Sequence, residues 1–205
     1  METVADNSLI TGAQRGDAEA FCELCRLHEA RLLRQAVYLC GDLELSEDLA
    51  QETLVAAWKS LRRYNGRCQF FTWLCAILLN RFRNFCRQRR PSPVSAFSSI
   101  ERADVERLLH SVPDASSSPS EAAQALERSA FLRDCIRRLP AKHREVIYLR
   151  FYVDDSLEGI AGALGCSLGT VKSRLFNALE KLRTMRELRA RLPEFQPAQQ
   201  EGTKP

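Results

Sequence analysis

Apolar residues recur with helical spacing through most of the chain. Between Asp17 and about Cys40 they fall close to the α-helical period, and Gly41 with Asp42 ends this pattern. Ser46 then offers a hydroxyl group for an N-cap, and the acids that follow it favour the first turn of a second helix. No alternating segment is long enough to predict a strand. The pattern therefore predicts an all-α protein.

A third helical segment follows the turn predicted at Asn65 and Gly66. Its expected start is Thr72, as the N-cap. The first half of this segment is apolar on almost all sides, which is typical of a helix in a core, while arginines interrupt the second half. Pro91 ends the helical pattern, because proline cannot continue it.

The composition changes after this third segment. Residues 91–119 concentrate serine and proline at both ends, and we interpret them as a flexible linker. The pattern thus predicts two helical domains, residues 17–90 and 120–190. An N-terminal extension, residues 1–16, precedes the first domain, and a disordered tail, residues 191–205, follows the second.

The sharpest local pattern lies between Ser156 and Leu182. A short helix, a turn at Gly165 and a longer helix follow one another with the spacing of a helix-turn-helix, whose second helix reads the major groove. The outward residues of the second helix are hydrogen-bond donors and cations, which suit base edges and phosphates. An ordinary helical hairpin with solvated charges is the alternative. The candidates are Thr170, Lys172, Ser173, Arg174, Asn177 and Lys181.

The net charge of +4 hides an uneven distribution. Residues 1–52 hold four basic and eleven acidic residues, whereas residues 53–100 hold nine basic residues and no carboxylate. A solvated surface usually mixes signs, so the second stretch indicates a binding surface for a polyanion. The acidic stretch indicates a protein partner or an internal counterweight.

Aromatic residues lie among the arginines between Arg62 and Arg90. Aromatic faces can stack on unpaired bases while arginines follow the backbone, a combination suited to single-stranded or melting DNA. For most of these aromatic residues, a place in the core is the better interpretation. For the loop from Tyr64 to Gln69 and for the arginines, we favour DNA binding.

The two predicted helical domains, one with the arginine-rich segment and one with the helix-turn-helix, resemble the sigma-70 family of bacterial RNA polymerase sigma factors. Within it they resemble the two-domain extracytoplasmic-function group. DLAQET before a tryptophan-containing helix resembles region 2.2, FFTWLCAILLNRFRNF resembles regions 2.3 and 2.4, and residues 132–183 resemble region 4 nearly throughout. Cys75 takes the place of a usual aromatic residue, and Leu78 with Leu79 replaces a small-basic pair. The resemblance implies a region 2 helical bundle and a region 4 helix-turn-helix, joined by the linker.

The resemblance also implies partners and residue roles. Core RNA polymerase would bind through the clamp helices of its largest subunit and through its flap, with Asp48, Gln51 and Glu52 as docking residues. Region 4 would read the minus-35 promoter element through the six candidates above. An anti-sigma factor would control the protein. The minus-ten element would be recognised and opened by Arg62, Arg63, Tyr64, Arg67, Gln69, Phe70, Trp73, Asn80, Arg81 and Asn84.

The cysteines and histidines provide no active site. Cys22, Cys25 and His28 share one predicted helix and are weak candidates for a metal site, because no second ligand pair is evident. We interpret the eight cysteines as thiols, since no secretory signal is visible. No nucleotide-binding or hydrolase motif is present. We therefore expect no enzymatic activity and no cofactor.

Two alternatives concern function and control. A helix-turn-helix regulator with an N-terminal sensor is disfavoured, because residues 1–90 predict only helices and lack the pattern of a phosphoacceptor domain. Redox or metal sensing by the cysteines is an alternative for the regulation alone. No run of apolar residues is long enough for a transmembrane helix, so we expect a cytoplasmic protein without direct membrane insertion.

Overall fold

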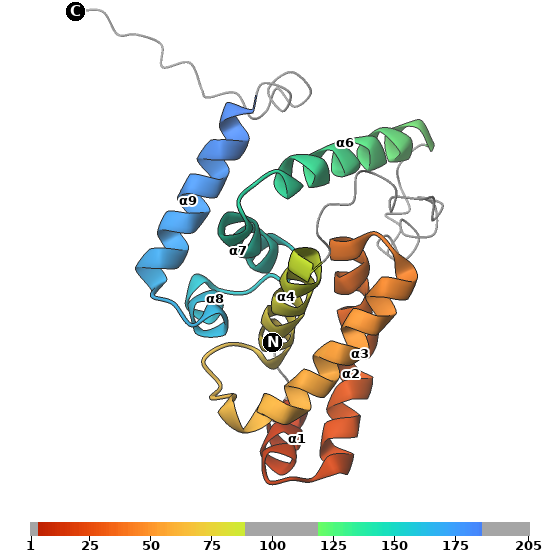
Figure 1. Ribbon diagram of the computed structural model, residues 1–205, viewed down its shortest axis with the longest axis vertical. Helices are drawn as coiled ribbons and strands as arrows, with labels where there is room; N and C mark the ends of the chain where they lie inside the picture. Colours follow the sequence, from red (N-terminus) through yellow and green to blue (C-terminus); the bar gives the residue numbers. More distant parts are fainter. Residues whose placement is uncertain (1–3, 89–118, 186–205) are drawn as a thin grey trace, which may run out of the picture. The chain divides into compact units, whose positions relative to one another are not determined.

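The computed structural model describes residues 4–88 and 119–185, and every element in these ranges is a helix (Figure 1). The absence of strands there confirms the all-α prediction. The predicted tail, and the predicted linker apart from Pro119, lie outside the described residues. The elements are α1 (Val4–Gln14), α2 (Ala18–Cys40), α3 (Leu43–Ser60), the 3-10 helix η1 (Leu61–Arg63), α4 (Phe70–Gln88), α6 (Pro119–Arg137), α7 (Ala141–Phe151), α8 (Leu157–Leu164) and α9 (Leu168–Thr184).

The chain divides into two compact units. The first contains residues 1–113 and 149–167, and the second contains residues 114–148 and 168–205. The predicted second domain, residues 120–190, therefore contributes to both units. None of the helices in the described ranges combines the length and the apolar character needed to cross a bilayer.

The first unit is built around α2. This helix packs against α1, α3 and α4, and α3 also packs against α4; Figure 1 shows α2 and α3 side by side. Helix α1 lies within the segment predicted as an N-terminal extension. Burial of large apolar side chains supplies most of the packing free energy of such a bundle. The fully buried side chains of the first unit include Leu24, Leu32, Val37, Leu61, Phe70, Phe71, Leu74 and Leu78.

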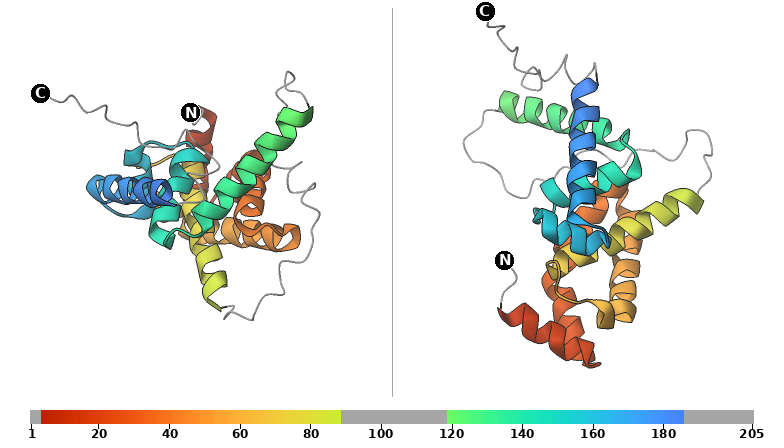
Figure 2. Two further views of the ribbon diagram at one scale, coloured as in Figure 1. Left: turned by 90° about the horizontal axis from the view of Figure 1, so that it is seen from above. Right: turned by 90° about the vertical axis from the view of Figure 1, so that its left-hand side faces the viewer.

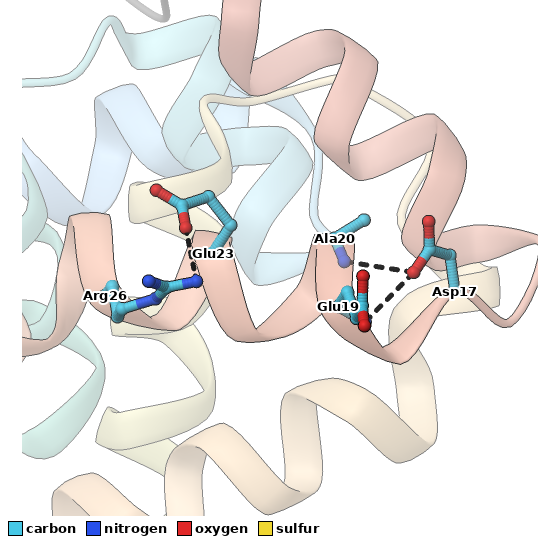
Figure 3. A network of polar contacts seen from close by, with 5 residues as sticks. All are labelled: Asp17, Glu19, Ala20, Glu23 and Arg26. Atoms are coloured by element: carbon cyan, nitrogen blue, oxygen red, sulfur yellow. Dashed lines mark hydrogen bonds and ion pairs between the residues drawn. The ribbon is translucent and has the colours of Figure 1, made fainter.

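The ends of α2 agree with the sequence pattern. The Asp17 carboxylate accepts hydrogen bonds from the backbone N–H groups of Glu19 and Ala20, as Figure 3 shows. These groups would otherwise lack a partner in the first turn. At the other end Gly41 has a positive φ of 68°, which glycine adopts without steric cost. Its N–H group donates a hydrogen bond to the Val37 carbonyl oxygen.

The predicted starts of α3 and α4 are wrong. Helix α3 begins at Leu43 with Asp42 as its N-cap, because the Asp42 carboxylate accepts a hydrogen bond from the Leu45 N–H group. Ser46 is buried inside the helix, and its hydroxyl group donates to the Asp42 carbonyl oxygen instead. Helix α4 begins at Phe70 rather than after Thr72, so Thr72 is a buried residue of the first turn.

In the second unit, α9 is one continuous helix (Figure 2). It buries Val171, Ala178 and Leu182, which recur at the spacing of one helical face. The Arg144 guanidinium donates a hydrogen bond of 2.7 Å to the Arg137 carbonyl oxygen and so ties the start of α7 to the end of α6. Among the side chains of α6 and α7 whose burial is described, those buried in this unit are Cys135, Ile136, Glu145, Val146, Ile147 and Tyr148.

Candidate nucleic-acid and protein interfaces

The predicted docking residues lie together on the exposed side of α3. Helix α3 buries Leu49 and Thr53 in the bundle, and this orientation leaves Asp48, Gln51 and Glu52 exposed. The Thr53 hydroxyl group donates to the Leu49 carbonyl oxygen at 2.7 Å, which satisfies this buried polar group within the helix. We call the three exposed residues the acidic face. Their exposure leaves them accessible to a partner.

An apolar groove continues the acidic face along α3, and the sequence analysis missed it. It is lined by Leu54, Val55 and Trp58 from α3 and by residues of α2 that include Phe21. Val55 is 54% exposed and Trp58 is 39% exposed. The Trp58 ring lies 4.9 Å from the Phe21 ring. Exposed apolar residues on the otherwise polar side of α3 were the sequence signal. The remaining lining residues are Ala18 and Cys22.

The loop before α4 presents arginines but holds its aromatic residues inward. Arg62, Arg63 and Arg67 are exposed, whereas Tyr64 is 8% exposed and Phe70 only 1% exposed. Gln69 is half-buried. The arginines therefore face solvent at the positions where a DNA backbone contact is predicted. Of the three aromatic residues predicted to contact the minus-ten element, Tyr64 and Phe70 are buried and Trp73 is half-buried.

An aromatic cluster of Tyr64, Phe70 and Trp73 closes the loop. The ring centroids lie 5.2 to 5.7 Å apart, within the range of favourable aromatic pairs. The Tyr64 hydroxyl group donates a hydrogen bond of 2.6 Å to the Cys68 carbonyl oxygen. From α1, the Gln14 amide donates to the carbonyl oxygens of Leu61 and Tyr64. These contacts fix the loop in a closed arrangement.

The second half of α4 carries the remaining predicted minus-ten residues. Asn80, Arg81 and Asn84 are exposed, in contrast to the buried first half of the helix. The Arg83 guanidinium donates a hydrogen bond to the Asn80 side-chain oxygen. Arg81 forms an ion pair with Glu52, with 3.7 Å between nitrogen and oxygen. One predicted DNA contact is thus joined to one residue of the acidic face.

The weak metal candidates do not form a metal site. No group of three or more His, Cys, Asp or Glu side chains within residues 4–88 and 119–185 is placed to hold a metal ion. Burial, with smaller contributions from Cys22 and Glu29, raises the pKa of the Cys25 thiol to about 11, so the thiol is protonated at neutral pH. All eight cysteines are free thiols.

His28 instead belongs to the core of the first unit. It is buried, and its ring lies 5.4 Å from Phe70 and 5.8 Å from Phe71. Burial lowers the His28 pKa, and this outweighs the opposing effect of Asp6; Arg31 lowers it further. The Arg31 guanidinium stacks 3.8 Å above the Phe71 ring. His28 therefore packs as a neutral ring against the start of α4.

The helix-turn-helix segment has well-defined caps. The Ser156 hydroxyl oxygen accepts a hydrogen bond of 2.9 Å from the Gly159 N–H group at the start of α8. Gly165 ends α8 with a positive φ of 61°. Helix α9 begins at Leu168, so Thr170 lies in its first turn. These features confirm the predicted succession of a short helix, a glycine turn and a second helix.

The predicted minus-35 residues lie on the outward side of α9. Lys172, Ser173, Asn177 and Lys181 are exposed, while Thr170 and Arg174 are half-buried. The Asn177 amide lies 3.5 Å from the Ser173 hydroxyl oxygen. Four of the six side chains are therefore accessible to a nucleic acid without a change in the helix.

Phe176 is a further candidate that the sequence analysis missed. Its side chain is 66% exposed and lies between the predicted base-contacting residues Ser173 and Asn177 on α9. An exposed aromatic ring there can contact the methyl group of thymine, which marks that base in the major groove. Its neighbour Leu179 is 41% exposed. The helical pattern contained the signal, because Phe176 falls outside the apolar face formed by Val171 and Ala178.

Two family models match the chain in the predicted order. Residues 24–91 match the model described as Sigma-70 region 2, and residues 135–184 match the model described as Sigma-70, region 4. Together the two matches cover more than half of the chain. They include the acidic face, the loop before α4 and the helix-turn-helix.

Similar proteins extend over nearly the whole chain. An RNA polymerase sigma-H factor of Pseudomonas aeruginosa is 32% identical over 86% of this chain and 91% of its own length. An ECF RNA polymerase sigma-E factor of Escherichia coli strain K12 is 31% identical over 88% of this chain and 94% of its own. The solved structure of CnrH in complex with the cytosolic domain of CnrY is 27% identical. It has a TM-score of 0.58 and covers 87% of this chain and 94% of that one.

Proposed function

Since the chain belongs to the sigma-70 family of RNA polymerase sigma factors, in its extracytoplasmic-function group, we propose that it directs core polymerase to promoters through three separate surfaces. The observation that carries this proposal is the order of the surfaces. An acidic face precedes a basic, aromatic loop and helix, and a helix-turn-helix with exposed donors follows. The proposed domains are residues 17–90 and 120–190, and the proposed compartment is the cytoplasm.

The acidic face is the proposed docking site for polymerase. Asp48, Gln51 and Glu52 would meet the clamp helices of the largest subunit, and the exposed Val55 and Trp58 would extend this contact with apolar area. Exposed charges steer association and set specificity, while buried apolar area supplies most of the affinity. The combination of an acidic face with a neighbouring apolar groove is suited to a helical partner with basic residues.

The loop before α4 and the outer side of α4 form the proposed minus-ten surface. Arg62, Arg63 and Arg67 would hold the DNA backbone while an extruded non-template base enters the loop. Base extrusion costs a few kcal/mol, which stacking and backbone contacts offset. Because Tyr64 and Phe70 are packed in the closed loop, their rings can reach a base only after the aromatic cluster opens. We propose that opening accompanies promoter melting.

Helix α9 forms the proposed minus-35 surface. Lys172, Ser173 and Asn177 would contact base edges, with Phe176 as an added apolar contact, and Lys181 would hold a phosphate. This surface needs no rearrangement, since these side chains are exposed. The flap of polymerase is the proposed partner for region 4 on the enzyme.

A regulatory protein is the fourth proposed partner. CnrH, which resembles this chain over most of its length, was solved in complex with the cytosolic domain of CnrY. We propose that an anti-sigma factor binds this chain in a similar manner and blocks polymerase. Co-purification from the native host would identify such a protein. Recovery of the chain only alone or on core polymerase would contradict this part of the proposal.

Charge reversal on the acidic face tests the docking proposal. The double variant Asp48→Lys/Glu52→Lys should lose core-polymerase affinity in a fluorescence titration, with little change in unfolding free energy, because exposed charges contribute little to stability. Glu158→Lys is a control for the single variants Asp48→Lys and Glu52→Lys, since Glu158 is an exposed acid on α8, outside the acidic face. Equal core affinity of the double variant and the wild-type chain would reject the acidic face as the docking site.

A further inference from the structure

The Glu52–Arg81 ion pair connects two surfaces that have separate proposed partners. Its atoms lie 3.7 Å apart, and the side chains are 59% and 43% exposed. Three other ion pairs in the described residues join positions three or four apart within one helix. In contrast, Glu52 belongs to α3 and Arg81 to α4. This pair therefore requires the packing of two helices against each other.

We propose that Glu52 and Arg81 mask each other in the free protein, and that polymerase docking releases Arg81 for the promoter backbone. The inference rests on the proposed function, in which Glu52 contacts polymerase and Arg81 contacts DNA. Once Glu52 turns to a basic group of polymerase, Arg81 loses its anionic partner on α3. A DNA phosphate then becomes the partner of the guanidinium.

The coupling works in both directions. A carboxylate close to a guanidinium competes with a phosphate for the same donors, so Glu52 lowers the DNA affinity of Arg81. Because the same pair must also break for Glu52 to meet polymerase, Arg81 lowers the polymerase affinity by a similar factor. Linkage then requires polymerase and DNA to raise each other's affinity by one common factor. An exposed ion pair contributes little free energy, so each factor should be about twofold to fivefold at low salt. High salt should reduce both factors, because screening weakens the pair.

Two neighbouring residues serve as matched controls. Asp48 is an exposed acid of the same face, one turn before Glu52, so Asp48→Asn and Glu52→Gln change the net charge equally. Arg87 is an exposed arginine of α4, so Arg87→Gln matches Arg81→Gln in the same way. A difference in affinity between a variant and its control therefore reports the loss of the ion pair, and not the change in the net charge of the protein.

The first measurement is DNA binding by the free, full-length protein. Fluorescence anisotropy with a labelled single-stranded oligothymidylate should show Glu52→Gln binding about twofold to fivefold more tightly than Asp48→Asn. The gain should disappear when Arg81→Gln is added to Glu52→Gln. Equal affinities of the Glu52→Gln and Asp48→Asn variants would overturn the proposal, as would a gain that persists without Arg81.

The second measurement is the affinity for core polymerase. Arg81→Gln should bind core more tightly than Arg87→Gln by the same factor, and equal affinities would overturn the masking proposal. If neither Asp48→Asn nor Glu52→Gln weakens core binding, the docking proposal itself fails and the inference fails with it. If both weaken core binding but no gain depends on Arg81, the docking proposal stands and masking is rejected.

Discussion

The two predicted DNA-binding surfaces differ in how accessible their side chains are. On α9, the residues proposed to read duplex DNA are mostly exposed, and Phe176 is 66% exposed. In the loop before α4 and at the start of that helix, Tyr64 and Phe70 are buried in an aromatic cluster, although stacking on unpaired bases needs accessible aromatic faces. A duplex presents its base edges without distortion, whereas a flipped base exists only after melting. A preformed surface such as that of α9 therefore suits duplex readout. A surface that is closed until melting, as near the start of α4, suits capture of a flipped base.

Truncation of one aromatic residue on each surface should give the largest contrast. Phe70→Ala removes a ring that is 1% exposed, so it should lower the unfolding free energy by about 3–5 kcal/mol. Phe176→Ala removes an exposed ring and should change stability by no more than about 0.5 kcal/mol. Urea unfolding of both variants measures the difference. Similar losses in the two variants would show that the two surfaces do not differ in packing.

Base readout by α9 should show the next largest effect. On a mapped promoter, Lys172→Ala or Asn177→Ala should each cost about 1–3 kcal/mol and relax specificity at one position. Lys181→Ala, the phosphate control, should weaken all duplexes alike and lower the salt dependence by about one unit of slope. Competition binding with point-substituted duplexes measures both effects. Unchanged selectivity in the Lys172 and Asn177 variants would show that these residues do not read bases.

The aromatic cluster can be loosened without removing a ring. Tyr64→Phe deletes the hydrogen bond to the Cys68 carbonyl oxygen, and the loss should lower the unfolding free energy by about 0.5–1.5 kcal/mol. If the cluster must open before strand capture, the variant holoenzyme should also melt a mapped promoter faster. Permanganate footprinting over time measures melting. Slower melting in this variant would contradict a closed starting state.

Mild acid should loosen the closed surface slightly through His28. Burial lowers the folded-state pKa of His28 below its ordinary value of 6.5, so protonation is easier in the unfolded chain. The resulting stability is present above pH 6.5 and is lost as the pH falls through the folded-state pKa. Urea unfolding across this range should show a smaller decline for His28→Gln than for the wild-type chain. Identical pH profiles would contradict this contribution.

The sequence predicted local structure where the determinants are themselves local. Helix α2 ends at Cys40, as the break in the pattern at Gly41 predicts, because Gly41 itself adopts the positive φ that ends the helix. The predicted start of α3 was wrong because Asp42 and Ser46 are both good capping residues, and the pattern alone does not distinguish them. Tertiary packing buries Ser46 and leaves the cap to Asp42.

The states of the binding surfaces could not be predicted from local pattern. Tyr64 follows two exposed arginines. Nothing nearby in the sequence shows that its ring packs against Phe70 and Trp73, or that the Gln14 amide donates to its carbonyl oxygen. The Glu52–Arg81 ion pair likewise depends on how α3 packs against α4. The acidic face was predictable because the apolar spacing of α3 fixes which residues point outward.

The most direct test of the account is run-off transcription with purified core polymerase on genomic DNA, followed by mapping of the start sites. The account predicts discrete start sites that core alone does not produce, with shared minus-ten and minus-35 sequences upstream. It also predicts their loss in the Asp48→Lys/Glu52→Lys variant. A transcript profile identical to that of core polymerase alone would contradict the assignment of this chain as a promoter-directing subunit.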